Sequence, residues 1–568
     1  MPYSNTQSCT NFLVTKGATK DGSTMITYAA DSHVLYGELY YRPAATYPAG
    51  TMFVVNEWDT GKKLGSIKQV EKTYSVVGNI NENQVSIGET TFTGLTDLQD
   101  TTGIIDYGSL MYITLQRATT ARDAIKIMSD LVTEYGYYST GESFSIADPN
   151  EVWILEMMGK GKKILNAKGE VDSKQWTKGA VWVALKVPDG YVCGHANQAR
   201  ITTFPKADGK KSINTKDKDF AKKINNPEVE CIYAYDVASY AKALGLYSGK
   251  DEVGFSFSDT YNPLEPSGAR FCEARVWAGF MKINKDAVAQ YEKYARGEDL
   301  KNRMPLWIKP TELLSVQDVM SLMRDHYEGT SMDMTKDVGA GPYQLPYRWR
   351  PMEWEYNGGT YVHERAVSTQ QTGFSFVAQM RSKFPNVIGG IIWFGVDDTY
   401  STCYVPMYCG ITDMPTCFRE GNGNMLEYSP TSAFWIFNKV SNFAYLRYND
   451  MIKDIVKVQN ELETSFVKKV EENDKTWADK NGEELLSLAN RFSKSQAQYT
   501  FVRWQRLEQY LIVKYMDGNV KVEENGKFKH SQYGEDRMVS PEHPLYPEWF
   551  YKQIVDDAGS NLKMPESK

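Results

Sequence analysis

Apolar residues in the first four hundred positions occur in short runs separated by tight turns, and this pattern predicts strands. The turns carry Gly, Pro, Asn and Asp, as in Lys20-Asp-Gly-Ser and Pro188-Asp-Gly. Several runs are almost wholly apolar, so we expect antiparallel hairpins in sheets that are buried on both faces. The expected strands are 11–15, 24–28, 74–77, 84–87, 143–146, 152–155, 181–185, 191–193 and 388–394.

Helical periodicity falls between these strands and takes over near the C-terminus. Thr120 begins a segment with capping spacing, and Gly136 is the expected C-cap. A second helix of this kind is expected over 315–326. Apolar residues also recur at helical spacing across 432–515, which predicts long amphipathic helices packed on the core, with a charged loop around 469–481. Helices covering both faces of antiparallel sheets favour an α+β fold with four αββα layers.

Composition narrows the function classes. The chain has 568 residues, 42% hydrophobic and 24% charged, which are ordinary globular values. Its net charge is −7 without a basic block, so we expect no nucleic acid partner. No apolar run reaches the length of a membrane span, so no membrane partner is expected either. Seven scattered cysteines and six histidines lack metal-binding spacing, and no phosphate-binding glycine pattern occurs, so we expect no metal and no cofactor.

Cys9 lies at the start of the first expected strand. If the Ser8–Cys9 bond is cut, Cys9 gains a free α-amino group whose ordinary pKa is about 7.7–8.0. That amine can act as the general base for the thiol of the same residue, so no partner histidine is required. An N-terminal nucleophile therefore gives this cysteine a chemical role, whereas a cysteine near a chain start ordinarily has none.

Several segments make the sequence similar to a known family. Residues 9–14, 20–26 and 30–32 resemble the start of the C69 dipeptidases, which are N-terminal-nucleophile hydrolases related to penicillin V acylase and bile salt hydrolase. The resemblance covers nearly the whole chain. It continues, in order, through 36–43, 88–91, 146–149, 195–200 and 270–275. It implies the four-layer αββα fold of these hydrolases, with added C-terminal helices, and supports Cys9 as the nucleophile.

The resemblance also implies a set of polar residues around Cys9. Asp31 would orient the Cys9 amine, and a turn-capping role is its alternative. Asn197 would donate its side-chain amide to the oxyanion, and Asn81 its backbone amide, although both also suit hairpin turns. Arg270 matches an arginine near the nucleophile, with a structural ion pair as its alternative.

Two further positions bear on this set. The wider superfamily has an arginine three residues before the aspartate, where this chain has Tyr28. This departure leaves open what tunes the thiol. His195 suggests a cysteine–histidine dyad, but the α-amine already fills the role of the base. Cys193 and Cys272 are expected to be small core residues.

The function best supported is a cysteine dipeptidase that hydrolyses dipeptides through a thioester, with a small peptide as substrate. An amide acylase acting on N-acyl amino acids or bile-salt-like conjugates would use the same centre. A third hypothesis is a non-catalytic, aromatic-rich binding protein in which Cys9 is never a terminus.

The predicted organisation is a propeptide or trimmed leader over 1–8, a catalytic core over 9–430 and a helical extension over 431–568. The subunit count stays open, with a homo-oligomer among the options. The compartment is also open: the chain as it stands predicts a cytoplasmic protein, and a longer natural start would predict export.

Overall fold

Two large sheets lie face to face at the centre of the molecule in the computed structural model, which describes residues 7–250, 254–349 and 352–566. The first sheet has seven antiparallel strands in the order β17-β14-β1-β2-β20-β21-β22. These strands are Trp307–Ile308, Val192–His195, Gln7–Val14, Thr24–Ser32, Thr372–Met380, Gly390–Val396 and Val405–Tyr408. The central position of β1 and β2 places Gln7–Val14 inside the fold.

The second sheet has nine strands in the order β15-β16-β13-β12-β11-β10-β9-β8-β3. All neighbours are antiparallel except β15 and β16, which run parallel. The strands are Ser212–Asn214, Cys231–Tyr233, Ala180–Lys186, Val152–Gly159, Gly141–Ala147, Ser86–Thr93, Ile80–Asn81, Val76–Val77 and Tyr41–Arg42. Strand β10 lies against β1 and β2 of the first sheet, so the two sheets meet at the N-terminal strand.

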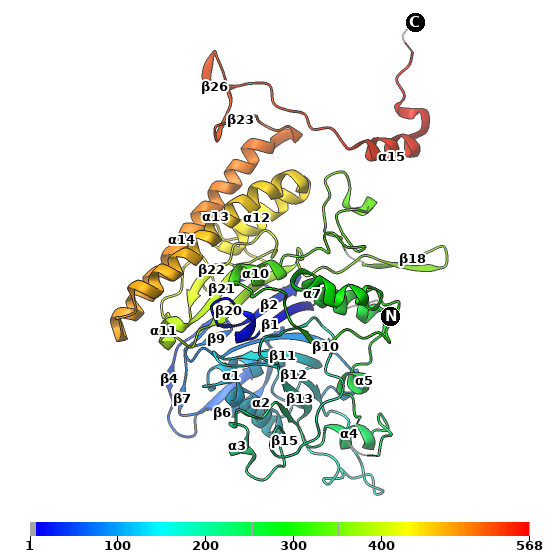
Figure 1. Cartoon of the computed structure of the whole chain (residues 1–568), viewed down its shortest axis with the longest axis vertical. Coiled ribbons are helices and arrows are strands. Elements are labelled where there is room, and N and C mark those ends of the chain that lie inside the picture. Colours follow the sequence, from blue (N-terminus) through cyan, green and yellow to red (C-terminus); the bar gives the residue numbers. More distant parts are fainter. Residues whose placement is uncertain (1–6, 251–253, 350–351, 567–568) are drawn as a thin grey trace.

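Helices cover the outer faces of both sheets, as Figure 1 shows. On the nine-stranded sheet, α1 and α2 pack with the outward residues of β11 to β13 in one apolar cluster. On the seven-stranded sheet, α7, α10 and the long C-terminal helices α12, α13 and α14 share a second, larger cluster with β1, β2 and β20 to β22. These helices are Tyr107–Leu115, Ala121–Tyr135, Ala274–Ile283, Val316–Leu322, Ala433–Leu446, Tyr448–Thr476 and Gly482–Tyr515. The predicted α+β class is therefore confirmed.

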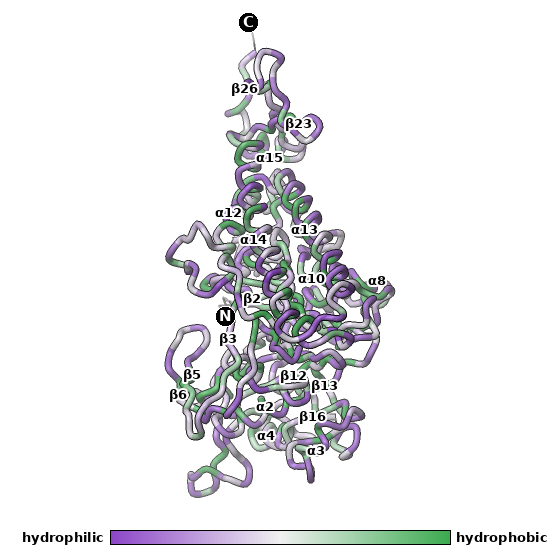
Figure 2. Tube along the Cα trace, turned by 90° about the vertical axis from the view of Figure 1, so that its left-hand side faces the viewer, coloured by the Kyte–Doolittle hydropathy of each residue, from purple (hydrophilic) through white to green (hydrophobic). Residues whose placement is uncertain are grey.

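Shorter elements complete the chain. Short helices are α3 Phe220–Lys223, α4 Val237–Ala243, α5 Phe257–Tyr261, α6 Pro266–Gly268, α8 Lys285–Val288, α9 Glu292–Ala295 and α11 Asn386–Gly389. Peripheral strands are β4 Ala45–Thr46, β5 Met52–Asn56, β6 Lys63–Lys68, β7 Lys72–Thr73, β18 Glu353–Tyr356 and β19 Gly359–Val362. Beyond α14 the chain narrows into an extension, visible in Figure 2, with β23 Glu523–Glu524, β24 Lys527–Phe528, β25 His530–Ser531, β26 Gly534–Met538 and α15 Glu548–Ala558.

Local sequence signals account for several helix boundaries. Thr120 caps α2 by accepting a hydrogen bond from the backbone N–H of Asp123, and Gly136 ends the helix with a φ of 81°, as predicted. Ser315 and Asp318 form a reciprocal capping box at the start of α10. That helix ends at Leu322, four residues before its predicted end.

The charged loop predicted around 469–481 is wrong over most of its length. Helix α13 continues to Thr476, and only 477–481 separate it from α14. The reason is that Phe466 and Val470 continue the buried stripe of the helix, while the charged residues between them face solvent.

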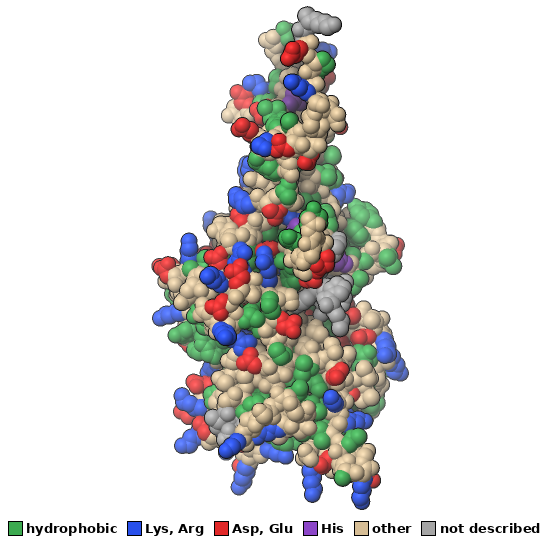
Figure 3. Space-filling view, turned by 90° about the vertical axis from the view of Figure 1, so that its right-hand side faces the viewer, with side chains coloured by type: hydrophobic (Ala, Val, Ile, Leu, Met, Phe, Trp, Pro, Cys, Tyr) green, Lys and Arg blue, Asp and Glu red, His purple; other side chains and the backbone are tan. Residues whose placement is uncertain are grey.

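Charged side chains are interspersed by sign over the face of the molecule that Figure 3 shows. Within the described ranges, no helix has the length and apolar character needed to cross a bilayer. Over the same ranges, no group of three or more His, Cys, Asp or Glu residues is arranged to hold a metal ion.

Candidate functional site

Cys9 lies in β1 between the two sheets, and only 6% of its surface is exposed. Its neighbour Phe12 contacts Gly279 of α7, whereas Asn11 faces β10, so alternate residues of β1 point to opposite sides. The Cys9 side chain therefore faces the second sheet. It borders a pocket that is lined by residues of both sheets. The other lining residues are Tyr28, Ala30, Asp31, Ser32, Val34, Leu35, Trp58, Asp59, Glu89, Thr91, Tyr107, Met111, Tyr112 and Phe374.

Asn197 holds the backbone nitrogen of Cys9. The Cys9 N–H donates to Asn197 Oδ1 at 2.9 Å, and Asn197 Nδ2 donates to the carbonyl of Thr91 at 2.7 Å. The register of β1 with β14 pairs Asn11 with His195, which brings the end of β14 beside Cys9. Asn197 then adopts a left-handed backbone with a φ of 60°, a conformation that asparagine tolerates better than most residues. Asn197 and Cys9 are therefore in contact, as predicted, and the amide nitrogen of Asn197 is hydrogen-bonded to the Thr91 carbonyl.

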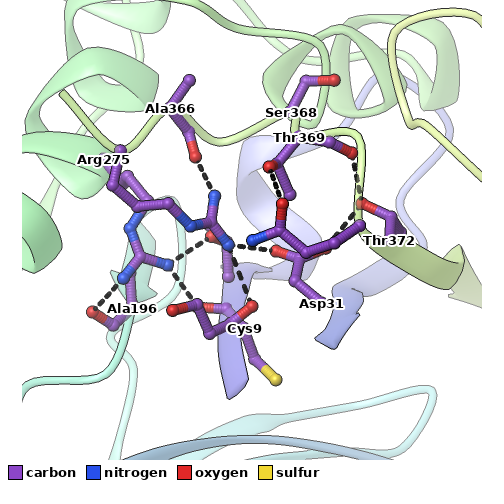
Figure 4. Close-up of polar contacts among 12 residues, drawn as sticks. Cys9, Asp31, Ala196, Arg275, Ala366, Ser368, Thr369 and Thr372 are labelled. Carbon is purple, nitrogen blue, oxygen red and sulfur yellow. Dashed lines mark hydrogen bonds and ion pairs between the residues drawn. The ribbon is translucent and has the colours of Figure 1, made fainter. Parts of the chain in front are cut away.

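Arg275 holds the carbonyl group of Cys9. Its Nη1 donates to the Cys9 oxygen at 2.6 Å and to Thr10 Oγ1 at 2.9 Å. Its Nη2 donates to the oxygens of Ala196 at 3.1 Å and of the Asn197 side chain at 2.9 Å. Figure 4 shows the guanidinium on one side of Cys9 and the sulfur pointing away from it. This fully buried arginine fixes the backbone of the cysteine and leaves its side chain facing the pocket.

Arg270, the arginine predicted near the nucleophile, points elsewhere. Its Nη2 pairs with Glu364 at 2.6 Å, and about a quarter of its side chain is exposed. The segment Ala269–Glu273 is a π-helical turn that leads into α7. A separation of five residues in a helix places Arg270 and Arg275 on different faces, and only the second faces β1. The structure thus favours the ion-pair alternative for Arg270.

Asp31 is buried beneath the Ser8–Cys9 peptide bond. In the register of β1 and β2, Ser8 lies opposite Asp31 and Cys9 opposite Ala30, so the predicted pairing of these two strands is observed. The Asp31 carboxylate accepts from Arg365 Nη2 at 2.5 Å and from Thr372 Oγ1 at 2.6 Å. Burial raises the pKa of Asp31, while Arg365 and Thr372 favour its charged form. The same Arg365 nitrogen donates to the Ser8 carbonyl oxygen at 3.0 Å.

Tyr28 and Glu89 flank the sulfur on the pocket side. The Tyr28 hydroxyl donates to Glu89 Oε1 at 2.6 Å. The Cys9 sulfur lies 3.7 Å from that carboxylate oxygen and 3.9 Å from the hydroxyl. The position where the wider superfamily has arginine therefore supplies a hydroxyl next to the thiol. The nearby guanidinium groups come instead from Arg275 and Arg365.

The thiol is protonated in this environment. Burial raises the pKa of Cys9 well above its ordinary value, and the negative charges of Glu89 and Asp31 raise it further. Burial also raises the pKa of Glu89 to about 7. The pKa of Glu142, behind Glu89, is raised still further by burial and by the charge of Glu89. A sulfur nucleophile here needs a base that removes its proton during attack.

Two other candidates lie apart from this arrangement. Asn81 belongs to the turn between β9 and β10, where its backbone N–H donates to the Val85 carbonyl at 2.9 Å. That donor is already used, which favours the turn alternative. His195 Nδ1 and Nε2 each lie 2.7 Å from a hydroxyl, of Thr90 and Ser145. Burial lowers the pKa of His195 to about 3, so this imidazole is a neutral core group.

The residues that sequence reasoning missed are Arg275, Arg365 and Glu89. Arg275 and Glu89 lie within segments that carry the family resemblance, but their residue types alone do not reveal which side chains converge. Arg365 lies more than three hundred residues from Cys9 and carries no local signal. Arg365 comes close to Cys9 because β20, which begins a few residues after Arg365, pairs with β2.

Comparisons with known proteins show which sequences this chain is similar to. The model of a family described as "Peptidase family C69" matches residues 8–461. A "Probable dipeptidase" of Latilactobacillus sakei is 22% identical over 471 residues, covering 78% of this chain and 82% of the relative. A "Probable dipeptidase" of Salmonella dublin is 24% identical, with coverages of 71% and 81%. A "Probable dipeptidase B" of Streptococcus pyogenes serotype M1 is 20% identical, with coverages of 89% and 93%.

Proposed function

The chain belongs to peptidase family C69, and we propose that it is a dipeptidase whose nucleophile is Cys9 after its release as an N-terminal residue. The observation that carries this proposal is the way Cys9 is held: two side chains fix its backbone, and its sulfur is left facing the pocket. Asn197 accepts from its nitrogen, Arg275 donates to its carbonyl oxygen, and its sulfur faces the pocket. Such fixation suits a residue whose nitrogen and sulfur must act together.

The proposed reaction uses one residue as both nucleophile and base. The α-amine of the mature Cys9 takes the thiol proton while the sulfur adds to the peptide carbonyl. The carbon–nitrogen bond then breaks, and the α-amine passes the proton to the leaving amine. Water hydrolyses the thioester, which releases the first amino acid and restores the thiol. Asn197 remains the predicted donor to the oxyanion, a role in which its amide would exchange the Thr91 carbonyl for the substrate oxygen.

Maturation is proposed to use the same thiol on the Ser8–Cys9 bond. The sulfur adds to the Ser8 carbonyl carbon, the bond from that carbon to the Cys9 nitrogen breaks, and the thiol proton passes to this nitrogen, so the amide becomes a thioester and Cys9 gains a free amine. Water then cleaves this thioester, so residues 1–8 leave with a carboxylate and Cys9 keeps its thiol and a free amine. Arg365 supports this step because it donates to the Ser8 oxygen, where negative charge would develop.

The proposed architecture is the four-layer αββα sandwich of N-terminal-nucleophile hydrolases. The two facing sheets with helices on both outer faces support it. Within it, we propose residues 1–8 as the leader, 9–430 as the catalytic core and 431–568 as a helical extension that packs on the core.

An amide acylase is the second candidate. The aromatic walls of the pocket, from Trp58, Tyr107, Tyr112 and Phe374, would also suit an apolar acyl group. Dipeptides are favoured because the similar curated proteins bear the name probable dipeptidase. A panel of dipeptides and N-acyl amino acids, assayed side by side on the mature protein, separates the two.

The test of the mechanism is intact mass and turnover for three proteins: wild type, Cys9→Ala and Cys9→Ser. We expect wild type to begin at Cys9 and to cleave dipeptides. Cys9→Ala should retain residues 1–8 and show no turnover, because it lacks the sulfur for both steps. Cys9→Ser should mature slowly and act weakly, because a hydroxyl is the poorer nucleophile near neutral pH.

Three other results would each contradict one part of the proposal. A Cys9→Ala chain that begins at the substituted alanine would refute self-cleavage. Turnover by that variant would refute the nucleophile. A wild-type chain that retains residues 1–8 and cleaves no peptide would favour the non-catalytic binding protein.

A further inference from the structure

One wall of the pocket carries carboxyl groups that the proposed reaction does not use. Glu89 lines the pocket with 1% of its surface exposed, and Asp59 lines it from the exposed rim. Asp59 accepts a hydrogen bond from the Tyr107 hydroxyl at 3.0 Å. Glu142 is fully buried and accepts from Thr91 Oγ1 at 2.8 Å. The pocket wall next to Cys9 therefore carries the carboxyl groups of Glu89 and Asp59, with that of Glu142 hydrogen-bonded to Thr91.

Glu89 is incompletely satisfied by the protein. Its Oε1 receives the Tyr28 hydroxyl and its carboxylate interacts with the carboxyl group of Glu142, while no other described residue donates to the buried Oε2. Across those residues, no lysine, arginine or histidine forms an ion pair with Glu89 or Glu142. A buried carboxylate without a cation or a full set of donors is costly. Such a group in a pocket wall indicates a ligand that brings the missing positive charge.

Substrate geometry identifies where a positive charge would lie. In a dipeptide, the free α-ammonium nitrogen is attached to the carbon next to the attacked carbonyl, two bonds from the reacting atom. When the carbonyl carbon is within about 3–3.5 Å of the sulfur, this nitrogen must lie close to the sulfur as well. Glu89 Oε1 is 3.7 Å from the sulfur, so an ammonium group there is within hydrogen-bonding reach of the carboxylate.

We propose that Glu89 binds the free α-ammonium group of the substrate, so that the enzyme requires an unblocked amino terminus on the residue whose carbonyl is attacked. This inference rests on the proposed function, because it assumes attack by Cys9. Asp59 at the rim adds negative potential at the entrance. The aromatic rings of Trp58 and Tyr107 line the same pocket.

The acid–base properties of the wall agree with this role. Burial, together with the negative charge of Asp59, raises the pKa of Glu89 to about 7 in the absence of a ligand. Since the pKa of Glu142 is raised further, Glu142 is the neutral member of the pair. An ammonium ion bound to Glu89 restores its ionised form. Binding of a dipeptide should therefore strengthen as pH rises through about 7, and weaken once the substrate amine loses its proton.

The test compares a dipeptide with its des-amino analogue, in which a hydrogen replaces the α-amino group. Wild type should prefer the dipeptide by at least about 10²-fold in kcat/KM, the scale of a lost buried hydrogen bond to a charged group. Glu89→Gln should reduce this preference to within about tenfold, mostly through KM. The contribution of Glu89 to the rise of kcat/KM near pH 7 should also be lost in this variant, while the rise that the Cys9 α-amine causes at about 7.7–8.0 remains.

Glu142→Gln is the matched control. It replaces a neutral carboxyl group with a neutral amide of the same shape and keeps an acceptor for Thr91, so the preference for the free amine should persist. A preference that is unchanged in Glu89→Gln, or equal cleavage of both substrates by wild type, would overturn the inference. An equal loss on both substrates in Glu89→Gln would assign the residue a structural role instead.

A second measurement requires no turnover. Iodoacetamide labels the Cys9 thiol, and L-alaninamide or propionamide is added as a protecting ligand that differs only in the amine. Alaninamide should protect wild type at least tenfold more effectively than propionamide, and this difference should vanish in Glu89→Gln. If wild type cleaves no peptide, the proposed function fails, while this protection still decides the inference. Equal protection by both amides would refute it.

Discussion

At the scale of single residues, the site is organised around the backbone of Cys9 as much as around its side chain. Asn197 and Arg275 contact each other as well as Cys9, so the nitrogen and the carbonyl oxygen of Cys9 are fixed by one connected network. The network lies on one side of β1 and the sulfur on the other (Figure 4). Substitutions in it should therefore change reactivity through position, without removing the nucleophile.

The two arginines of one helical segment allow a matched comparison. Arg275→Met should lower kcat by at least about 10²-fold, because it leaves the Cys9 and Ala196 carbonyl groups without their buried donor. Arg270→Met should stay within a few-fold of wild type, because it removes a partly exposed pair with Glu364. Steady-state kinetics and thermal melts of both variants test this. Equal activities in two folded variants would contradict the role assigned to Arg275.

The sequence identifies the type of site but only part of its membership. Cys9, Asp31 and Asn197 were predicted from short motifs and do converge, because each lies in or next to one of the paired strands β1, β2 and β14. Arg270 was predicted only from its match to a family arginine, whereas the side chain that contacts Cys9 belongs to Arg275, five residues later. The contribution of Arg365 depends on a distant strand pairing, which no local pattern encodes.

At the scale of elements, the distance between the two sheets sets the geometry of the sulfur. Strand β10 carries Glu89, and the preceding residue is Gly88, which lies against β1 and β2. A Cβ atom at Gly88 would lie 2.8 Å from the side-chain amide of Asn11 and 3.3 Å from Tyr28 Cβ. The absence of a side chain at this position lets β10 approach closely enough for Glu89 to reach Tyr28 and Cys9.

Gly88→Ala should therefore reduce both stability and activity. The added methyl group forces β10 away from β1, which costs about 1–3 kcal/mol in an overpacked core. The displacement also moves Glu89, so KM for dipeptides should rise. Ile125→Val is the control, because it lies in the separate cluster beneath α2 and costs about 0.5–1.5 kcal/mol. Chemical denaturation and kinetics of both variants distinguish the effects: a normal KM in Gly88→Ala would contradict the spacing argument.

Strands were predicted well wherever an apolar run is flanked by turn residues. The turn at 148–150 joins β11 to β12 in a hairpin, as expected. The turn at 188–190 instead leads from β13 of the nine-stranded sheet to β14 of the seven-stranded sheet, so the hairpin expected there is wrong. Strand lengths were underestimated, since β2 extends to Ser32 and β10 to Thr93. These extensions contain Asp31, Glu89 and Thr91, polar residues that an apolar pattern excludes from strands. The functional positions of this protein are thus where the pattern of hydrophobicity fails.

At the scale of the whole molecule, the C-terminal helices are integral to the larger apolar cluster. Phe437 of α12 stacks on Trp504 of α14 with ring centroids 4.4 Å apart, and both are buried in the cluster that includes β20 to β22. The family match ends at residue 461, inside α13. The proposed boundary at 430 therefore marks a change of secondary structure, while the apolar core continues across it.

Two truncations test how far this core extends. A chain that ends at Pro430 exposes the outer face of the seven-stranded sheet, so we expect it to aggregate or to lack a cooperative melt. A chain that ends at Pro544 loses α15, which has no buried residue. Its stability should stay within about 0.5 kcal/mol of the full chain, as for changes at exposed positions, and its turnover should be unchanged. Size-exclusion chromatography, thermal melts and dipeptide assays compare the two. A soluble, active chain ending at Pro430 would show that the catalytic core is independent of the helices that cover it.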